Sequence, residues 1–186
     1  MDSGNIGFVL LCAAFVFVMT PGLAMFYGGL VRKKNVVNTM MTSIFIIGVG
    51  IVMWVLFGYS LSFAPSGNAF IGDFRWLGLE GVSLTEGYTD DASIPNMVFS
   101  AFQMMFAVIT PALITGAVAG RMKFKSIFVF TIFWSLIVYY PLAHMVWGQG
   151  GLLGADGIGA LDFAGGDVVH ILSLIHISEP TRLRCI

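Results

Sequence analysis

Charged residues are scarce in this chain. Only 10% of its 186 residues are Asp, Glu, Lys or Arg, whereas a soluble domain carries roughly 25%. Hydrophobic residues make up 58% of the chain, and the mean hydropathy is +0.91. This composition excludes an ordinary soluble domain and indicates a membrane protein. The net charge of −1 and the absence of a basic stripe exclude a nucleic-acid-binding surface.

Three further patterns are missing. The two cysteines, Cys12 and Cys185, are too few for a disulfide framework. No segments of about ten residues alternate apolar and polar positions, as transmembrane β-strands do. His144 and His170 fall in different apolar runs, without the neighbours that a metal or catalytic site requires. The sequence therefore predicts an all-α polytopic membrane protein that is not an enzyme and holds no metal or other cofactor.

Long apolar runs are what the sequence has instead. A helix needs about 20 mostly apolar residues to cross a bilayer. Four stretches meet this requirement and a fifth begins near the C-terminus: 6–30, 36–63, 95–120, 126–147 and 162 onward. The first stretch is too long for a signal peptide, and its basic cluster follows it instead of preceding it. We therefore expect four full spans and the start of a fifth.

Basic residues are concentrated in two of the predicted loops. The loops after the first and third spans hold six of them: Arg32, Lys33, Lys34, Arg121, Lys123 and Lys125. The loop 64–94 holds only Arg75, and the loop between the fourth and fifth spans holds none. Because Lys and Arg are enriched in cytoplasmic loops, we expect a multi-pass cell-membrane protein with its N-terminus outside the cytoplasm.

Three aromatic residues stand near the predicted outer ends of the spans. Phe102 and Phe106 are four residues apart and share one helix face, and Trp147 ends the fourth span. Position alone favours packing for the phenylalanines and an interfacial anchor for the tryptophan. The alternative is a cation-binding cup, because an aromatic face attracts a desolvated cation by about 2 kcal/mol.

Four ionisable residues near the last two spans need an explanation. If the fifth helix begins at Asp162, His170 lies about 12 Å into it, where an ionisable residue indicates either function or a helix–helix hydrogen bond. Asp162 itself is expected to cap the free N–H groups of this helix. Asp167, one turn further, needs a partner or water. His144 is expected to make a structural hydrogen bond.

Two prolines, Pro21 and Pro111, stand inside the first and third spans. Each removes a backbone donor, and each follows a threonine, Thr20 or Thr110. We expect each threonine hydroxyl to bond to a freed carbonyl, and we interpret both prolines as kinks without chemistry.

Four segments together resemble the ammonium transporter family, which is related to the Rhesus glycoproteins. They are residues 20–35 (TPGLAMFYGGLVRKKN), 102–121 (FQMMFAVITPALITGAVAGR), 143–148 (AHMVWG) and 161–171 (LDFAGGDVVHI). Their order and spacing are those of the family. The resemblance covers residues 1–171 and implies the first half of an eleven-span fold, ten of whose spans form two inverted halves. Trp147 favours the ammonium transporter branch, because the Rhesus branch lacks it.

The resemblance also implies roles for five residues. Phe106 and Trp147 match the outer ammonium site, and Phe102 matches the first of two stacked phenylalanines that gate the pore below it. His170 matches the first of two pore histidines, and Asp162 matches an acidic residue that supports the outer site. The implied function is transmembrane ammonium transport. The cation is recruited outside, deprotonated and passed as ammonia through an apolar pore that disfavours charge.

The implied partners are ammonium or ammonia, methylammonium, the lipid bilayer, the other subunits of a homotrimer and a cytoplasmic PII-type regulatory protein. The alternative function is an ammonium sensor built on the same membrane domain. The match ends at about residue 171, after which Leu172 and Leu174 replace the small residues of the family. We expect residues 172–186 to be a foreign or read-through tail. We also expect this fragment to be inactive alone, because the second histidine is absent.

Overall fold

The computed structural model describes residues 1–65, 68–155 and 157–174. Within these residues all regular secondary structure is helical, and there is no strand. The α-helices are α1 (Ser3–Leu30), α2 (Val36–Met53), α3 (Tyr59–Phe63), α4 (Asn96–Val118), α5 (Phe124–Trp134), α6 (Tyr140–Trp147) and α7 (Leu172–Leu174). Two 3-10 turns, η1 (Lys33–Asn35) and η3 (Leu77–Leu79), and three π-helical turns, η2 (Trp54–Gly58), η4 (Ser135–Tyr139) and η5 (Gly166–Ile171), complete the set.

Four continuous helices are long and apolar enough to cross a membrane. They cover Ser3–Leu30, Lys33–Phe63, Asn96–Val118 and Phe124–Trp147. The second joins η1, α2, η2 and α3, and the fourth joins α5, η4 and α6. The predicted fold class and the four full spans are therefore confirmed, with ends that differ from the predicted ones by three residues or fewer.

The fifth span begins later than the sequence suggested. Residues 162–165 are not helical, and η5 starts at Gly166. Gly165 has a φ of +75°, a left-handed conformation that glycine adopts at little cost and that cannot continue a helix. His170 therefore lies about 6 Å into the helix at 1.5 Å per residue, not about 12 Å. Most of the predicted foreign tail, residues 175–186, lies outside the described residues.

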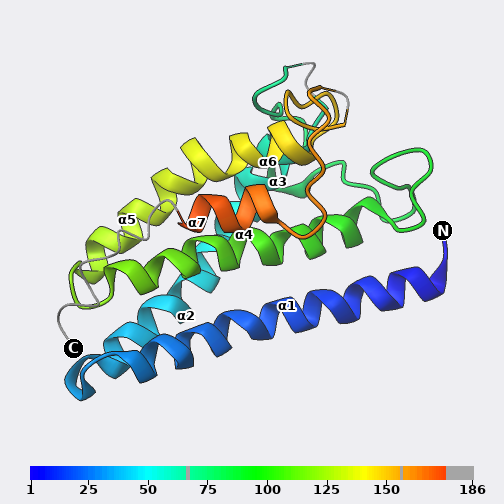
Figure 1. Cartoon of the computed structure of the whole chain (residues 1–186). Helices are drawn as coiled ribbons and strands as arrows, with labels where there is room; N and C mark the ends of the chain where they lie inside the picture. Colours follow the sequence, from blue (N-terminus) through cyan, green and yellow to red (C-terminus); the bar gives the residue numbers. More distant parts are fainter. Residues whose placement is uncertain (66–67, 156, 175–186) are drawn as a thin grey trace.

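The helices place the loops at two opposite ends (Figure 1). α1 and α4 run side by side, α2 packs against both, and α3 packs against α6. The turns 31–35 and 119–123 share one end, where Asn35 lies against Gly120. At the other end, the backbone N–H of Asp2 donates to the Ser93 carbonyl at 2.9 Å, which joins the N-terminus to the loop 64–95.

The contact between α2 and α4 is close and partly polar. The hydroxyls of Ser43 on α2 and Thr115 on α4 share a buried hydrogen bond of 2.9 Å. A Cβ added at Gly50 would lie 2.9 Å from Cγ2 and 3.3 Å from Cα of Val108. Small residues that let backbones approach, with polar side chains bonding across the contact, are typical of helix pairs in membranes.

We predicted that each threonine hydroxyl would bond to the carbonyl that the following proline leaves without a donor, and this prediction is wrong. Pro111 frees the carbonyl of Ala107, but Thr110 Oγ1 donates at 2.6 Å to the carbonyl of Phe106, four residues before itself. Thr20 Oγ1 is buried and has no hydrogen-bond partner among the described residues. Both helices continue through their prolines.

The π-helical turns were not predicted, although one of them has a signal in the sequence. Pro141 lies two residues after the end of η4 and cannot donate to the carbonyl of Ile137 four residues earlier. A turn that closes with a wider hydrogen-bond ring avoids this missing bond. η2 ends at Gly58, where an added Cβ would lie 2.7 Å from the Tyr140 ring. The two turns therefore flank a close contact between the second and fourth spans.

Replacing Gly50 with leucine should destabilise the chain, because the added side chain would enter the space that Val108 occupies. Overpacking of this kind typically costs about 1–3 kcal/mol. The measurement is loss of helicity in lipid-free micelles titrated with a denaturing detergent. Gly48→Leu is the matched control, because a Cβ at Gly48 meets nothing within 4 Å. Equal losses of helicity in Gly50→Leu and Gly48→Leu would refute the close contact between α2 and α4.

Candidate functional site

The structure brings the three predicted aromatic residues together. Phe102 and Phe106 on α4 have ring centroids 5.0 Å apart at 81°, and Phe106 lies 6.5 Å from Trp147, the last residue of α6, at 66°. These separations are those of interacting aromatic rings. All three rings are half-buried. They form one group at the end of the molecule that holds the long loops, and their role in cation binding remains a prediction.

The end of α6 that carries Trp147 is fixed by His144. This histidine is fully buried. Its Nδ1 lies 3.1 Å from the Ser62 carbonyl oxygen and its Nε2 lies 2.8 Å from that of Asn68. The backbone N–H of Gly148 donates to the His144 carbonyl at 2.9 Å. The expected structural hydrogen bond is confirmed, and it ties α6 to the end of α3 and to the following loop.

Tyr88 is a second anchor for this region, and the sequence analysis missed it. Its ring stacks on Phe99 with centroids 4.9 Å apart and meets Phe63 edge-on at 5.6 Å. Gln149, two residues after Trp147, donates from its backbone N–H to the Tyr88 hydroxyl at 3.1 Å and from Nε2 to the Tyr88 carbonyl at 3.0 Å.

Burial keeps the Tyr88 hydroxyl neutral to high pH. It raises the pKa of Tyr88 to about 12, against an opposing contribution from the bond to the Gln149 N–H. A tyrosine of ordinary pKa is already protonated at neutral pH, so the hydroxyl accepts the Gln149 bond without bringing a negative charge to the site, and burial extends this neutral state to higher pH. The available sequence signal was an aromatic residue between Glu86 and Asp90, in the acidic second half of the loop.

Asp162 caps the start of η5, as predicted. Its Oδ1 accepts the N–H of Gly166 at 2.6 Å. Its Oδ2 accepts the N–H groups of Asp167 and Val168 at 3.1 Å and 3.2 Å. A carboxylate at a helix N-terminus satisfies orphan donors and complements the helix dipole. Both carboxylate oxygens of Asp162 are thus engaged in shaping the backbone, and its support of an ammonium site remains a prediction.

His170 lies one helical turn after Asp167 on η5. Its side chain is exposed in the single chain, and that of Asp167 is half-buried. The His170 backbone bonds to the Gly165 carbonyl at 2.9 Å and accepts Ser173 Oγ at 3.1 Å. No described histidine lies beside it: His144 is bonded on α6, and His176 is outside the described residues. Within the described part of the chain, no group of three or more His, Cys, Asp or Glu could hold a metal ion.

Replacing Asp162 with alanine should unfold the start of η5, because three N–H groups would lose their acceptor. Loss of such a cap costs about 0.5–2 kcal/mol, so amide hydrogen exchange at Gly166, Asp167 and Val168 should accelerate by roughly 2- to 30-fold. Asp167→Ala is the control, since its carboxylate makes no hydrogen bond among the described residues. Equal exchange in both variants would show that the cap does not hold this segment.

Comparison with known proteins gives a consistent result. The family model described as "Ammonium Transporter Family" matches residues 7–175. An ammonium transporter of Bacillus subtilis is 51% identical over 173 residues, covering 93% of this chain and 42% of the relative. Ammonium transporter Amt1 of Archaeoglobus fulgidus is 39% identical over 173 residues, covering 93% and 41%. The chain thus spans about two fifths of the length of these curated relatives.

Solved structures agree with the sequence comparisons. The crystal structure of Candida albicans Mep2 superposes with a TM-score of 0.79 at 32% identity, covering 91% of this chain and 36% of that one. A structure titled "Sensor Amt Protein" gives a TM-score of 0.76 at 27% identity, covering 89% and 40%. The matched family consists of membrane transporters and not enzymes. This chain belongs to the ammonium transporter family.

Proposed function

We propose that this chain is the part of an ammonium transporter that recruits the cation and begins its pore. The observation that carries the proposal is the contact of Phe106 with Trp147 at 6.5 Å, from two different spans at one end of the bundle. Two ring faces at a membrane surface attract a cation as it loses water. The relatives named as ammonium transporters support ammonium, and methylammonium as its analogue, as the cation.

The proposed pathway runs from the aromatic group past Phe102 towards His170. Ammonium and potassium have similar size and charge, but only ammonium can lose a proton. An apolar pore disfavours the bare cation strongly, because burying an unpaired charge is costly. The ion therefore gives up its proton near the mouth and continues as ammonia. His170 accepts or donates a hydrogen bond to it, as a neutral imidazole does, while Asp162 holds the backbone around the mouth.

The pore wall needs a second half. The His170 side chain is exposed in the single chain, so the described residues leave one side of the proposed pathway open. We propose that further membrane spans close it, that the chain alone does not transport, and that the complete protein is a homotrimer. An ionisable side chain within a span normally faces protein or a water-filled cavity and not lipid.

The orientation of the chain follows from its two ends. The six basic residues lie on the turns 31–35 and 119–123 and at the start of α5, and Lys and Arg are enriched in cytoplasmic loops. We propose that this end faces the cytoplasm, where a PII-type protein would bind, and that Met1 and the aromatic group face outward. An epitope at Met1 should react with antibody on intact cells, and reaction only after permeabilisation would reverse the assignment.

An ammonium sensor is the second candidate function. The likeness to a structure titled "Sensor Amt Protein" favours keeping it, because a sensor uses the same membrane domain to bind the cation. The two functions differ in flux: a sensor binds ammonium and conducts none.

To test the proposal, this chain is co-expressed with the part of the Bacillus subtilis transporter that it does not match. The host is a bacterium without ammonium transporters of its own. Co-expression should produce methylammonium uptake, and the chain alone should produce none. Uptake by the chain alone would refute the need for a second half. Binding without uptake in the paired system would identify the sensor.

Phe106→Ala in the paired system should raise the half-saturating methylammonium concentration by up to about 30-fold. This factor corresponds to loss of a cation–aromatic attraction of about 2 kcal/mol. Phe133→Ala is the control, because Phe133 is 58% exposed on α5, away from the aromatic group. An unchanged half-saturating concentration in Phe106→Ala and Trp147→Ala would contradict the aromatic site.

A further inference from the structure

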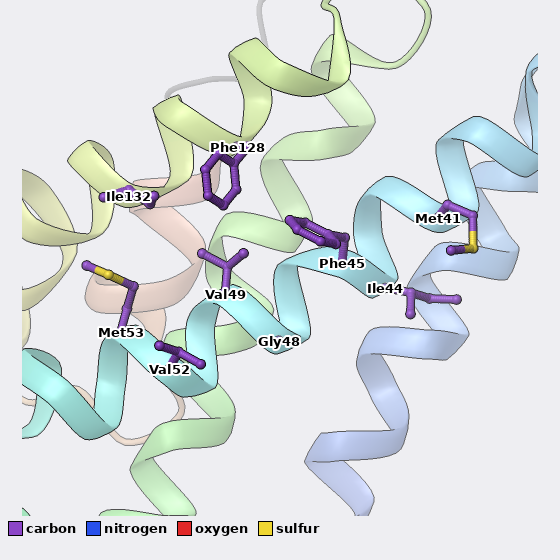
Figure 2. A pocket seen from close by; sticks show the side chains of 9 residues that line it. All are labelled: Met41, Ile44, Phe45, Gly48, Val49, Val52, Met53, Phe128 and Ile132. Atoms are coloured by element: carbon purple, nitrogen blue, oxygen red, sulfur yellow. The ribbon is translucent and has the colours of Figure 1, made fainter. Parts of the chain in front are cut away.

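Two features of the molecule have no task in the proposed transport pathway. A groove of about 590 Å³ runs between α2 and α5, but only apolar side chains line it, so no side chain there can donate a hydrogen bond or ionise (Figure 2). The other feature is His144, a fully buried ionisable side chain. Its surroundings give it a chemical property that goes beyond holding α6 in place.

The two ring nitrogens of His144 each face a backbone carbonyl. Nδ1 lies 3.1 Å from the Ser62 oxygen, and Nε2 lies 2.8 Å from the Asn68 oxygen. A carbonyl oxygen only accepts hydrogen bonds, and a neutral imidazole has one donor nitrogen and one acceptor nitrogen. A neutral His144 therefore directs one lone pair at a carbonyl oxygen, whereas a protonated His144 donates to both carbonyls.

The nitrogen that lacks a proton in the neutral ring finds no donor nearby. Within the described residues, the two carbonyls are the only hydrogen-bond partners of the His144 ring, and the buried Ser62 hydroxyl has no partner of its own. A Cβ added at Gly148 would lie 2.6 Å from Nδ1 and 3.0 Å from the Ser62 oxygen, so the packing is close. A buried acceptor without a donor is costly, which disfavours the neutral ring in this arrangement.

Two helix ends favour a positive charge at the same place. The second span ends at Phe63 and the fourth ends at Trp147, so Ser62 and His144 each lie in the last turn of a long helix. The last carbonyls of a helix lack donors within the helix and form the negative end of its dipole. A protonated histidine near such an end is stabilised. The ends of two spans therefore offset part of the cost of burying the imidazolium charge.

No carboxylate shares this proton in the described part of the chain. The elements that pack against α6 are α3, η4 and η5, and the loops after α3 and α6 complete its surroundings. None of the other described ionisable side chains of these segments bonds to His144. They are Tyr59, Asp73, Arg75, Glu80, Glu86, Tyr88, Asp90, Asp91, Tyr139, Tyr140, Asp162, Asp167 and His170.

We propose that His144 is a pH-dependent positioning residue for Trp147. As the pH falls, the ring takes up a second proton and donates to both carbonyls, which locks the end of α3 and residue Asn68 of the following loop onto α6. As the pH rises, one of the two hydrogen bonds is lost and the loop opens more often. Trp147 is three residues after His144 on the same helix face, so the position of its ring depends on this lock. The inference does not depend on ammonium transport.

Nitrogen-15 NMR of the full-length chain in micelles tests the protonation step. The chain has three histidines, and replacing His170 and His176 with glutamine leaves His144 as the only labelled imidazole. At about pH 8 one ring nitrogen should carry a proton, and at about pH 5 both should, since histidine changes its charge between these values. A ring that keeps a single proton over the whole range would overturn the proposal.

Amide hydrogen exchange tests the lock. The N–H of Gly72 donates to the Leu61 carbonyl at 2.7 Å, and that of Leu152 donates to the Ala69 carbonyl at 3.0 Å. Both bonds lie next to the carbonyls that His144 faces. Protection factors, which are corrected for the intrinsic effect of pH on exchange, should rise at both amides by about tenfold between about pH 8 and about pH 5. This factor corresponds to the roughly 1.5 kcal/mol of one hydrogen bond from a charged donor.

His144→Gln should remove this pH dependence, because a glutamine amide does not titrate. The N–H of Ala92, which donates to the Thr89 carbonyl at 3.0 Å in the same loop, is the internal control and should show no change with pH. An equal rise at Ala92, or the same rise in His144→Gln, would show that the pH acts elsewhere and would overturn the lock. The nitrogen-15 measurement does not use this variant, so it decides the protonation step even where His144→Gln fails to fold.

The indole N–H resonance of Trp147 tests the positioning role. It is identified by its loss in Trp147→Phe. In the unsubstituted chain it should shift over the pH range in which His144 gains its second proton, and in His144→Gln it should stay fixed. A resonance that does not shift while His144 titrates would show that the lock does not reach Trp147 and would overturn the assignment of His144 as its positioning residue.

Discussion

The structure depends on one constraint: inside a bilayer, every backbone N–H and C=O group needs a partner within the protein. Continuous helices meet this need, and the four long spans of this chain do so. The regular α-helical hydrogen-bond pattern is interrupted where the helices contain prolines or widen into π-helical turns. η4 precedes Pro141, and Thr110 donates to the Phe106 carbonyl at 2.6 Å beside Pro111. These local adjustments let the spans remain continuous and still approach one another closely.

The same constraint bears on the end of the bundle that holds the long loops. Loops outside the spans must fold without regular structure, and buried side chains supply their anchors. His144 faces the carbonyls of Ser62 and Asn68 from within α6, and Tyr88 holds Gln149 just beyond Trp147. Asp162 supplies acceptors for the first N–H groups of η5. Residues outside the aromatic group thus fix the backbone that presents the aromatic rings.

The two ends of the bundle have different chemistry. Half-buried aromatic rings and an acidic loop occupy one end, whereas six basic residues and the N-termini of α2 and α5 occupy the other. In the proposed function, a cation approaching the first end meets ring faces that attract it.

The sequence by itself determined the four spans, the clustering of basic residues in two turns and the capping role of Asp162, because hydropathy, charge and helix-end chemistry are local properties. It also placed Phe102 and Phe106 on one helix face. Only the tertiary structure decided that Phe106 meets Trp147, that His144 lies between two backbone carbonyls and that Tyr88 anchors Gln149, since these pairs join segments far apart in the chain. The start of η5 at Gly166 also required the structure, because the left-handed Gly165 and the Asp162 cap act together.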